Sequence, residues 1–480
     1  MSDHVDVLIV GAGLSGIGAA AHLTKDLPEV TYAVLEGRAA SGGTWDLFRY
    51  PGVRSDSDMF TLGYRFRPWR GDKALADGAS ILAYVRETAA DYGVEEHIRY
   101  GHRVTHAAWD SATARWTVTA EVDGDERRIT ADFLWSCSGY YDYDRGHRPH
   151  FEGEERFGGT LVHPQHWPAD LDVADKRVVV IGSGATAVTL VPALAEQGAA
   201  HVTMLQRSPT YVLPLAARDR FAGAARTVLG ERGSYPLVRA KNVLVATALY
   251  QLSRHRPAVV RGLVRKANVA LLPPGYDVDT HFRPTYDPWD QRLCLVPDGD
   301  LFRAISDGAA SVVTDTIRTF TETGVELASG EHLDADVVVT ATGLELLLFG
   351  GATLSVDGEQ VDPHDRMAYR AMMLSGVPNF AFTIGYTNAS WTLKADLVSE
   401  YVVRVLRRMR GEGRRTVVPT PDDSVEGAPL MDFDAGYVRR AAHLLPQQGT
   451  VAPWRLKQNY LYDALALRRA RLDDGVLTFR

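Results

Sequence analysis

The chain has 480 residues, of which 45% are hydrophobic and 23% charged, a composition typical of a soluble globular protein of roughly three domains. Its net charge of −8 argues against a nucleic-acid-binding protein. The two cysteines, Cys137 and Cys294, are far apart and offer neither a CxxC redox pair nor the spacing of a zinc site, which fits a reducing compartment.

The N-terminal residues run directly into an apolar pattern typical of a strand. They show neither the basic segment nor the cleavage site of a signal peptide. No uncharged apolar run approaches the roughly 18 residues that a membrane-spanning helix needs. We therefore expect a cytoplasmic protein.

A glycine-rich motif follows the first predicted strand. The apolar run 5–10 leads into Gly11, Gly13 and Gly16, an alanine-rich predicted helix comes next, and a second apolar run ends in Glu36. In such a βαβ unit the first glycine makes a tight turn, the second admits a pyrophosphate, and the third lets helix and strand pack closely. The pyrophosphate sits on the helix N-terminus, and the acid accepts hydrogen bonds from the adenosine ribose. The sequence therefore predicts an N-terminal dinucleotide-binding domain.

A long loop without helical or strand periodicity covers residues 42–56. It is rich in Trp, Arg, Tyr and Asp, and it includes Gly43, Thr44, Trp45 and Asp56. Long loops of this kind more often bind ligands than act as spacers, so we expect a binding loop. The alternative is a surface loop whose aromatic side chains only pack.

Two distant stretches, 132–139 and 336–343, share an acid, an apolar strand and a turn of two small residues and Gly. We expect each nucleotide-binding domain to end in this strand and turn, which carries the chain back past a cofactor. Residues 116–122 and 127–135 predict an antiparallel meander before the first turn, and Cys137 within that turn is expected to be a buried small residue.

Residues 142–168 predict a connector that ends in an unusual aromatic and histidine pattern. Its characteristic positions are Phe157, Gly159, His163, Trp167 and Pro168. The histidines of this region have no Cys, Asp or Glu at ligand spacing, so no metal site is predicted.

A second glycine-rich motif, G-x-G-x-x-A, begins at Gly182 and Gly184 after another buried strand pattern. The following strand ends not in an acid but near Arg207 and Ser208. An arginine suits the 2′-phosphate of NADPH, and the missing acid avoids repelling it, so this unit should prefer NADPH to NADH. Thr186 and Ser208 could add hydrogen bonds, and the alternative for Arg207 is an ordinary surface arginine.

The fold class is therefore α/β, with two Rossmann-like dinucleotide-binding domains and an inserted helical subdomain. We expect the first domain in 1–141 and 345–480, the connector in 142–168, the second domain in 169–211 and 290–344, and the insertion in 212–289. The insertion is helical and basic. Such a segment can lie on a membrane surface, but we favour a helical lid over an active site.

Two such motifs with the 157–168 pattern between them resemble the flavin-dependent monooxygenases. The ending Trp167-Pro168 is similar to that of the type I Baeyer–Villiger monooxygenases. The loop 42–56 fits that family's longer motif, [AG]-G-x-W-x4-[FY]-P-[GM]-x3-D, without a mismatch. The resemblance covers essentially the whole chain and is closest to the ethionamide-activating branch.

The resemblance implies specific roles for the residues named so far. FAD would lie on Gly11, Gly13, Gly16 and Glu36, and NADPH on Gly182, Gly184, Thr186 and Arg207. The loop residues Gly43, Thr44, Trp45 and Asp56, and Ser208, are expected to be further cofactor-binding residues. The family's catalytic arginine falls on Arg292, with Asp56 as its acidic partner. A lysine that often precedes this arginine is replaced by Gln291, which would leave Arg207 carrying more of the NADPH selectivity.

The implied reaction is the Baeyer–Villiger oxidation of ketones to esters or lactones by NADPH and O₂ through a flavin C4a-peroxide, with oxygenation of thioethers or thioamides. The alternatives are a flavin-containing N/S-monooxygenase without ketone activity and an NADPH-dependent flavin reductase. A disulfide reductase would need a cysteine pair that the chain lacks, and a non-catalytic sensor would not need Arg292 and Asp56. His163 and Trp167 are expected to act as a hinge rather than as acid–base groups. The sequence does not predict the oligomeric state.

Overall fold

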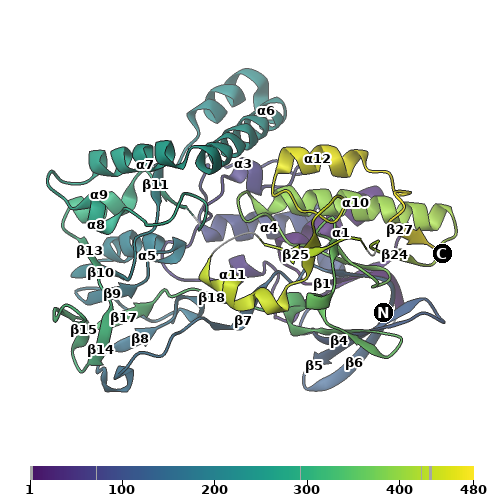
Figure 1. Ribbon diagram of the computed structural model, residues 1–480, viewed down its shortest axis with the longest axis horizontal. Coiled ribbons are helices and arrows are strands. Elements are labelled where there is room, and N and C mark those ends of the chain that lie inside the picture. Colours follow the sequence, from purple (N-terminus) through teal and green to yellow (C-terminus); the bar gives the residue numbers. More distant parts are fainter. Residues whose placement is uncertain (1–3, 72, 292, 423, 432–434) are drawn as a thin grey trace.

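Two β-sheets organise the molecule, one in each nucleotide-binding unit (Figure 1). The computed structural model describes residues 4–480 except 72, 292, 423 and 432–434. The first sheet has nine strands in the order β20-β19-β4-β5-β6-β1-β2-β3, with β23 beside β6. The second has five strands in the order β13-β10-β9-β17-β8. This confirms the α/β class with two Rossmann-like units.

The first sheet collects its strands from both ends of the chain. They are β1 (His4–Val10), β2 (Tyr32–Leu35), β3 (Ile98–Arg99), β4 (Arg103–Asp110), β5 (Arg115–Val122), β6 (Asp125–Ser136), β19 (Thr353–Val356), β20 (Glu359–Val361) and β23 (Phe380–Phe382). Its helices are α1 (Leu14–Asp26), α2 (Thr44–Leu47), α3 (Met59–Leu62), α4 (Gly78–Asp91), α10 (Trp391–Gly411), α11 (Gly436–Ala441) and α12 (Tyr460–Arg469). Short strand pairs close the C-terminal part: β21 (Ala368–Tyr369) with β22 (Met373–Leu374), β24 (Val417–Pro419) with β27 (Leu477–Phe479), and β25 (Gly427–Pro429) with β26 (Gln447–Gly449).

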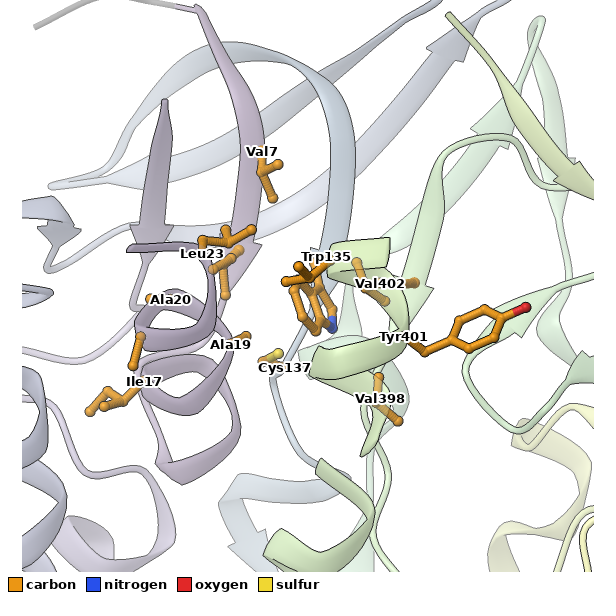
Figure 2. Close-up of a cluster of buried hydrophobic side chains, with 14 of the residues drawn as sticks. Val7, Ile17, Ala19, Ala20, Leu23, Trp135, Cys137, Val398, Tyr401 and Val402 are labelled. Carbon is orange, nitrogen blue, oxygen red and sulfur yellow. The ribbon is translucent and has the colours of Figure 1, made fainter. Parts of the chain in front are cut away.

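The core of the first unit lies between α1, the sheet and α10. β1 runs parallel to both β2 and β6, and Val7 and Trp135 are fully buried. Figure 2 shows Trp135 between the side chains of α1 and those of α10, with Cys137 beside it. The alanines of α1 leave room for this close packing, which explains why the first helix is so rich in small residues. As predicted, Cys137 is a buried small residue.

The second unit is a parallel sheet covered by helices. Its strands are β8 (Thr160–Val162), β9 (Arg177–Ile181), β10 (His201–Gln206), β13 (Ala310–Thr314) and β17 (Val337–Thr340). Its helices are α5 (Ala185–Glu196) and α9 (Asp300–Ser306), and β14 (Ile317–Thr321), β15 (Gly324–Leu327) and β16 (His332–Asp334) form a small antiparallel sheet. β12 (Cys294–Pro297) pairs in parallel with β11 (Val212–Leu215) outside the main sheet.

The 157–168 pattern is built into the second sheet. Its middle forms β8, an edge strand that runs parallel to β17. Gly159 is required there, because a Cβ at this position would lie 2.5 Å from the Asp336 carbonyl oxygen. Phe157 packs edge-on against Phe320, and Trp167 packs on the hydrophobic core between the sheet and α5. The sequence predicted a connector here and did not predict the strand.

A two-stranded ribbon joins the two units. β7 (Tyr141–Gly146) leaves the first unit and β18 (Leu344–Leu346) returns to it, and the two strands pair in antiparallel fashion. His163 braces this ribbon. Its Nε2 lies 3.3 Å from the Gly343 carbonyl oxygen, and its ring covers Gly146, where a Cβ would lie 1.9 Å from Cε1.

The helical insertion consists of α6 (Arg220–His255), kinked at Gly230, α7 (Pro257–Leu271) and α8 (Val278–His281). Arg239 of α6 fastens it to the first unit. Its guanidinium donates hydrogen bonds to the carbonyl oxygens of Phe60 and Gly63, each at 2.7 Å, and lies 3.6 Å from the Asp396 carboxylate. Among the helices that the structure describes, none is long and apolar enough to cross a membrane.

Replacing Gly146 with alanine should weaken the ribbon. The new methyl group would displace the His163 ring and its contact with Gly343, so we expect the free energy of unfolding to fall by about 1–3 kcal/mol in denaturant titrations. Gly262→Ala is the matched control, because a Cβ there meets nothing within 4 Å and alanine favours the α7 helix. Equal stabilities of the two variants would contradict the bracing role.

The ribbon should also loosen in acid. Burial lowers the pKa of His163 below 6.5, and its hydrogen bond to Gly343 opposes this only in part. A group with a lower pKa in the folded state gains its proton on unfolding. Its stabilisation is therefore complete above the unfolded pKa of about 6.5 and is lost as the pH falls from there through the lower pKa of the folded state. Thermal unfolding should show a larger loss for the wild type than for His163→Gln between about pH 7.5 and 5.5. Parallel pH profiles would exclude this coupling.

Candidate cofactor-binding site

One large cavity, of about 450 Å³, extends from the first glycine-rich turn to helix α5 of the second unit. Eight of the predicted site residues line it: Gly11, Gly13, Glu36, Gly43, Thr44, Trp45, Asp56 and Thr186. Gly16, Gly182, Gly184, Arg207 and Ser208 lie outside its wall, as do Phe157, Gly159, His163, Trp167 and Pro168. Arg292 lies outside the described residues. No described residue of 212–289 lines the cavity, and a helical lid over the active site stays a prediction.

The first glycine-rich turn is as compact as the motif predicts. Gly11 has φ +101°, and a Cβ there would lie 2.7 Å from the Cys137 carbonyl oxygen. A Cβ at Gly16 would lie 1.8 Å from the carbonyl oxygen of Gly11. Larger side chains would therefore push the helix and the neighbouring turn apart.

Both glycine-rich turns leave a helix N-terminus open. α1 and α5 begin after Gly13 and Gly184, and neither glycine supplies a side-chain cap. In contrast, Asp77 and Asp219 cap α4 and α6 with hydrogen bonds to backbone N–H groups. The uncapped N–H groups, with the positive end of the helix dipole, suit the pyrophosphates of two dinucleotides.

Glu36 holds the first turn in shape. Its side chain is only 6% exposed, and its carboxylate accepts hydrogen bonds from the backbone N–H of Ala12 at 2.8 Å and of Arg38 at 2.9 Å. Burial raises the pKa of Glu36, and these two hydrogen bonds oppose the shift. Because Glu36 lines the cavity, its carboxylate could also accept a hydrogen bond from a ribose hydroxyl.

A buried carboxylate fixes the start of the binding loop. Asp46 is 6% exposed and receives three guanidinium groups, from Arg38 at 2.7 Å, Arg49 at 2.7 Å and Arg86 at 2.8 Å. Arg38 also donates to the Gly43 carbonyl oxygen at 3.2 Å. These contacts hold the segment that carries Gly43, Thr44 and Trp45 against the first turn.

The second half of the loop reaches the other unit. Arg54 forms an ion pair with Asp300 at the start of α9. Tyr50 packs on the core of the second unit, where burial raises its pKa to about 12 against the effect of a hydrogen bond with Thr186. Asp56 is half-buried and lines the cavity. The expected pairing of Asp56 with Arg292 falls outside the described residues.

The second glycine-rich turn repeats the geometry of the first. Gly182 has φ +134°, and a Cβ would lie 2.3 Å from the Ala341 carbonyl oxygen. Gly184 is exposed, with open space where a side chain would stand. The Ser183 hydroxyl donates to the Ser208 carbonyl oxygen at 3.1 Å, which brings the end of β10 to the turn. Arg207 is exposed beside it, while the side chain of Gln206 is buried.

Sequence reasoning missed several wall residues. Arg38 and Tyr143 line the cavity, and the Tyr143 hydroxyl lies 3.1 Å from Thr44 Oγ1. Tyr386 and Trp391 reach the cavity from the C-terminal part of the chain, where Trp391 donates to Ser15 Oγ at 2.7 Å. The run of tyrosines that follows the 132–139 turn could have revealed Tyr143, but no local pattern marks Tyr386 or Trp391.

The donor set of the two turns suits organic cofactors. The described residues contain no group of three His, Cys, Asp or Glu side chains that could hold an ion. The two open helix N-termini, the glycine turns and the buried Glu36 fit an adenine dinucleotide at each motif.

Comparison with known proteins agrees with this geometry. Residues 74–240 match the flavin-binding monooxygenase-like family, and residues 9–68 match an NAD(P)-binding Rossmann-like domain. The fold is similar to that of an oxidised steroid monooxygenase bound to NADP, with a TM-score of 0.76 and 22% identity over 99% of both chains. It is also similar to cyclohexanone monooxygenase from Rhodococcus sp. Phi1 bound to NADP⁺, with a TM-score of 0.71 and 19% identity over 87% of both chains.

Curated relatives are much closer in sequence. The FAD-containing monooxygenase EthA of Mycobacterium tuberculosis is 57% identical over all 480 residues and 98% of its own length. The probable FAD-binding monooxygenase AlmA of Acinetobacter baylyi is 49% identical over the whole chain and 97% of its own length. The chain therefore belongs to the FAD-containing monooxygenases, in the EthA branch of the type I Baeyer–Villiger class that the 42–56 and 157–168 patterns predict.

Proposed function

We propose that the protein uses NADPH and O₂ to convert ketones to esters or lactones and to oxygenate thioethers or thioamides. The observation that carries this proposal is one continuous cavity that runs from the first glycine-rich turn to α5, the helix that follows the second glycine-rich turn. A flavin ring held at one end could meet a nicotinamide held at the other. Bound FAD, once reduced by NADPH, supplies the oxygen-activating chemistry.

The residues of the chain would position and protect this chemistry. The two glycine turns and Glu36 bind the cofactors, while Tyr386 and Trp391 help to exclude water from the wall. Arg292 would place a fixed positive charge where negative charge develops on oxygen, and Asp56 would hold that guanidinium in place. The ion pair between Arg54 and Asp300 keeps the loop that carries Asp56 against the second unit.

The β7/β18 ribbon supports a hinge role for the 157–168 pattern. His163 contacts Gly146 at the end of β7 and Gly343 immediately before β18, but it does not line the cavity. Burial lowers the pKa of His163, so its imidazole is mainly neutral at pH 7 and does not supply a positive charge to the reaction. A role in coupling the movements of the two units fits these contacts better than proton transfer.

A reductase that uses a cysteine thiolate is the weaker alternative. Burial raises the pKa of the Cys137 thiol to about 12, against a hydrogen bond with Thr383, so a thiolate is not available there. A monooxygenase that oxidises only sulfur and nitrogen compounds remains the second candidate, because the same cavity serves both reactions.

Isotope labelling tests the proposed reaction. Purified protein supplied with NADPH, ¹⁸O₂ and a panel of ketones, thioethers and thioamides should place one labelled oxygen atom in the ester, lactone or sulfoxide. Label in the sulfoxides alone would favour the second candidate. Consumption of NADPH without label in any organic product would refute the proposal.

Arg292→Ala should separate flavin reduction from oxygen insertion. NADPH should still bleach the flavin, since hydride transfer does not need this charge, while product formation should fall by about 10²-fold or more. Stopped-flow absorbance and product analysis measure the two steps. Retained ester and sulfoxide formation would contradict the assigned role.

Arg207→Ala should weaken NADPH selectively. The loss of one charge-assisted contact to the 2′-phosphate should raise KM for NADPH roughly ten- to a hundredfold and leave KM for NADH nearly unchanged. Arg318→Ala, at another exposed arginine of the same unit, is the matched control. Equal effects on both cofactors would show that Arg207 does not bind the phosphate.

A further inference from the structure

The insertion carries most of the exposed apolar side chains of the described chain. The described residues include eighteen exposed large hydrophobic side chains. Eleven of them lie on α6 and α7, although these two helices span only residues 220–271. Three more lie on α12. Figure 1 shows α7, α6 and α12 along one edge of the molecule, with α6 projecting beyond it.

These exposed side chains are not the ones by which α6 packs against the rest of the molecule. α6 already buries Tyr235, Val238 and Arg239 against the first unit, where Arg239 binds the backbone around α3. Its exposed Leu237, Leu244 and Leu252 recur at intervals of seven and eight residues and so form a second stripe along the helix. An apolar stripe that faces away from the core marks an interaction surface.

The kink of α6 carries Val228, the most exposed of these residues. Val228 is 80% exposed and Leu229 50% exposed, immediately before Gly230, which breaks the helix with φ +66°. A Cβ at Gly230 would meet nothing within 4 Å. The kink is therefore an open apolar tip.

The positive charge of residues 220–271 indicates that this surface binds a negatively charged partner. Residues 220–271 contain ten lysines and arginines and a single acidic residue, Glu231, although the chain as a whole carries −8. Some of these cations are used internally: Arg254 and Arg261 pair with Asp290 and Asp287. Among the described residues, Arg220, Arg232, Arg256 and Lys266 are exposed and form no ion pair.

We propose that α6 and α7 dock the enzyme on an anionic lipid bilayer, with the tip at Val228 and Leu229 inserted below the headgroups and the exposed cations at headgroup level. Apolar helix faces combined with lysine and arginine are typical of helices that lie in the membrane interface. Each cation near an anionic surface adds attraction, which salt screens. This surface is separate from the cofactor cavity, so the proposal extends beyond the proposed reaction.

Vesicle sedimentation tests the proposal on the full FAD-loaded protein. The wild type should sediment with vesicles that contain phosphatidylglycerol, remain in solution with phosphatidylcholine alone, and be released by high salt. Val228→Ser/Leu229→Ser and the fourfold change of Arg220, Arg232, Arg256 and Lys266 to Gln should each lower the partition coefficient at least about tenfold. Thermal unfolding and flavin content should stay at wild-type values in both variants.

Matched controls lie on other surfaces. Val451→Ser removes a side chain that is 53% exposed, and Arg127→Gln/Arg128→Gln removes two exposed cations from the β5–β6 hairpin. Both should bind vesicles like the wild type. Failure of the wild type to bind, equal binding to both lipids, or equal losses in the controls would overturn the proposal. So would a dimer in sedimentation velocity that Val228→Ser/Leu229→Ser dissolves, if no vesicle binding accompanies it.

Discussion

The close approach of backbone to backbone at two glycines governs the architecture of the site. Gly11 lies against the carbonyl of Cys137, and Gly182 lies against the carbonyl of Ala341. In both units the strand that precedes the glycine-rich turn and the strand that ends in the small-residue turn lie side by side and run parallel. Any side chain at either glycine would part these strands at the point where a pyrophosphate is expected to bind.

The two turns are held in different ways. In the first unit, buried carboxylates hold the turn and the adjoining loop. Glu36 accepts a hydrogen bond from the backbone of the turn, and Asp46 forms ion pairs with three arginines. In the second unit, the turn is tied by the Ser183 hydroxyl to the end of β10, and its glycines and Arg207 remain accessible. A firmly built first site suits a resident flavin, and a more open second site suits a cofactor that must enter and leave in each turnover.

Much of this architecture follows from the sequence because its signals are local. The glycine motifs, the buried strands before them and the shared 132–139 and 336–343 turns depend on residues close together in the chain, and each lies where the pattern predicts. The failures have a different origin. Residues 160–162 form a strand because β17 offers an edge for pairing. Tyr386, which precedes α10, and Trp391, its first residue, reach the wall through tertiary packing. The sequence of 212–289 predicts its helices, but not that none of its residues lines the cavity.

The pairing of β23 with β6 has a consequence for the order in which the molecule can assemble. Trp135 is buried between α1 and α10, and β6 is not fully paired until residues 380–382 are present. The ribosome therefore completes all five strands of the second sheet, residues 160–340, before the first unit can close its core. During that interval the nascent first unit exposes a large aromatic side chain and an unpaired strand edge, which is where a chaperone would be most needed. The second unit lies in one continuous segment, so it can fold before the rest of the chain is synthesised.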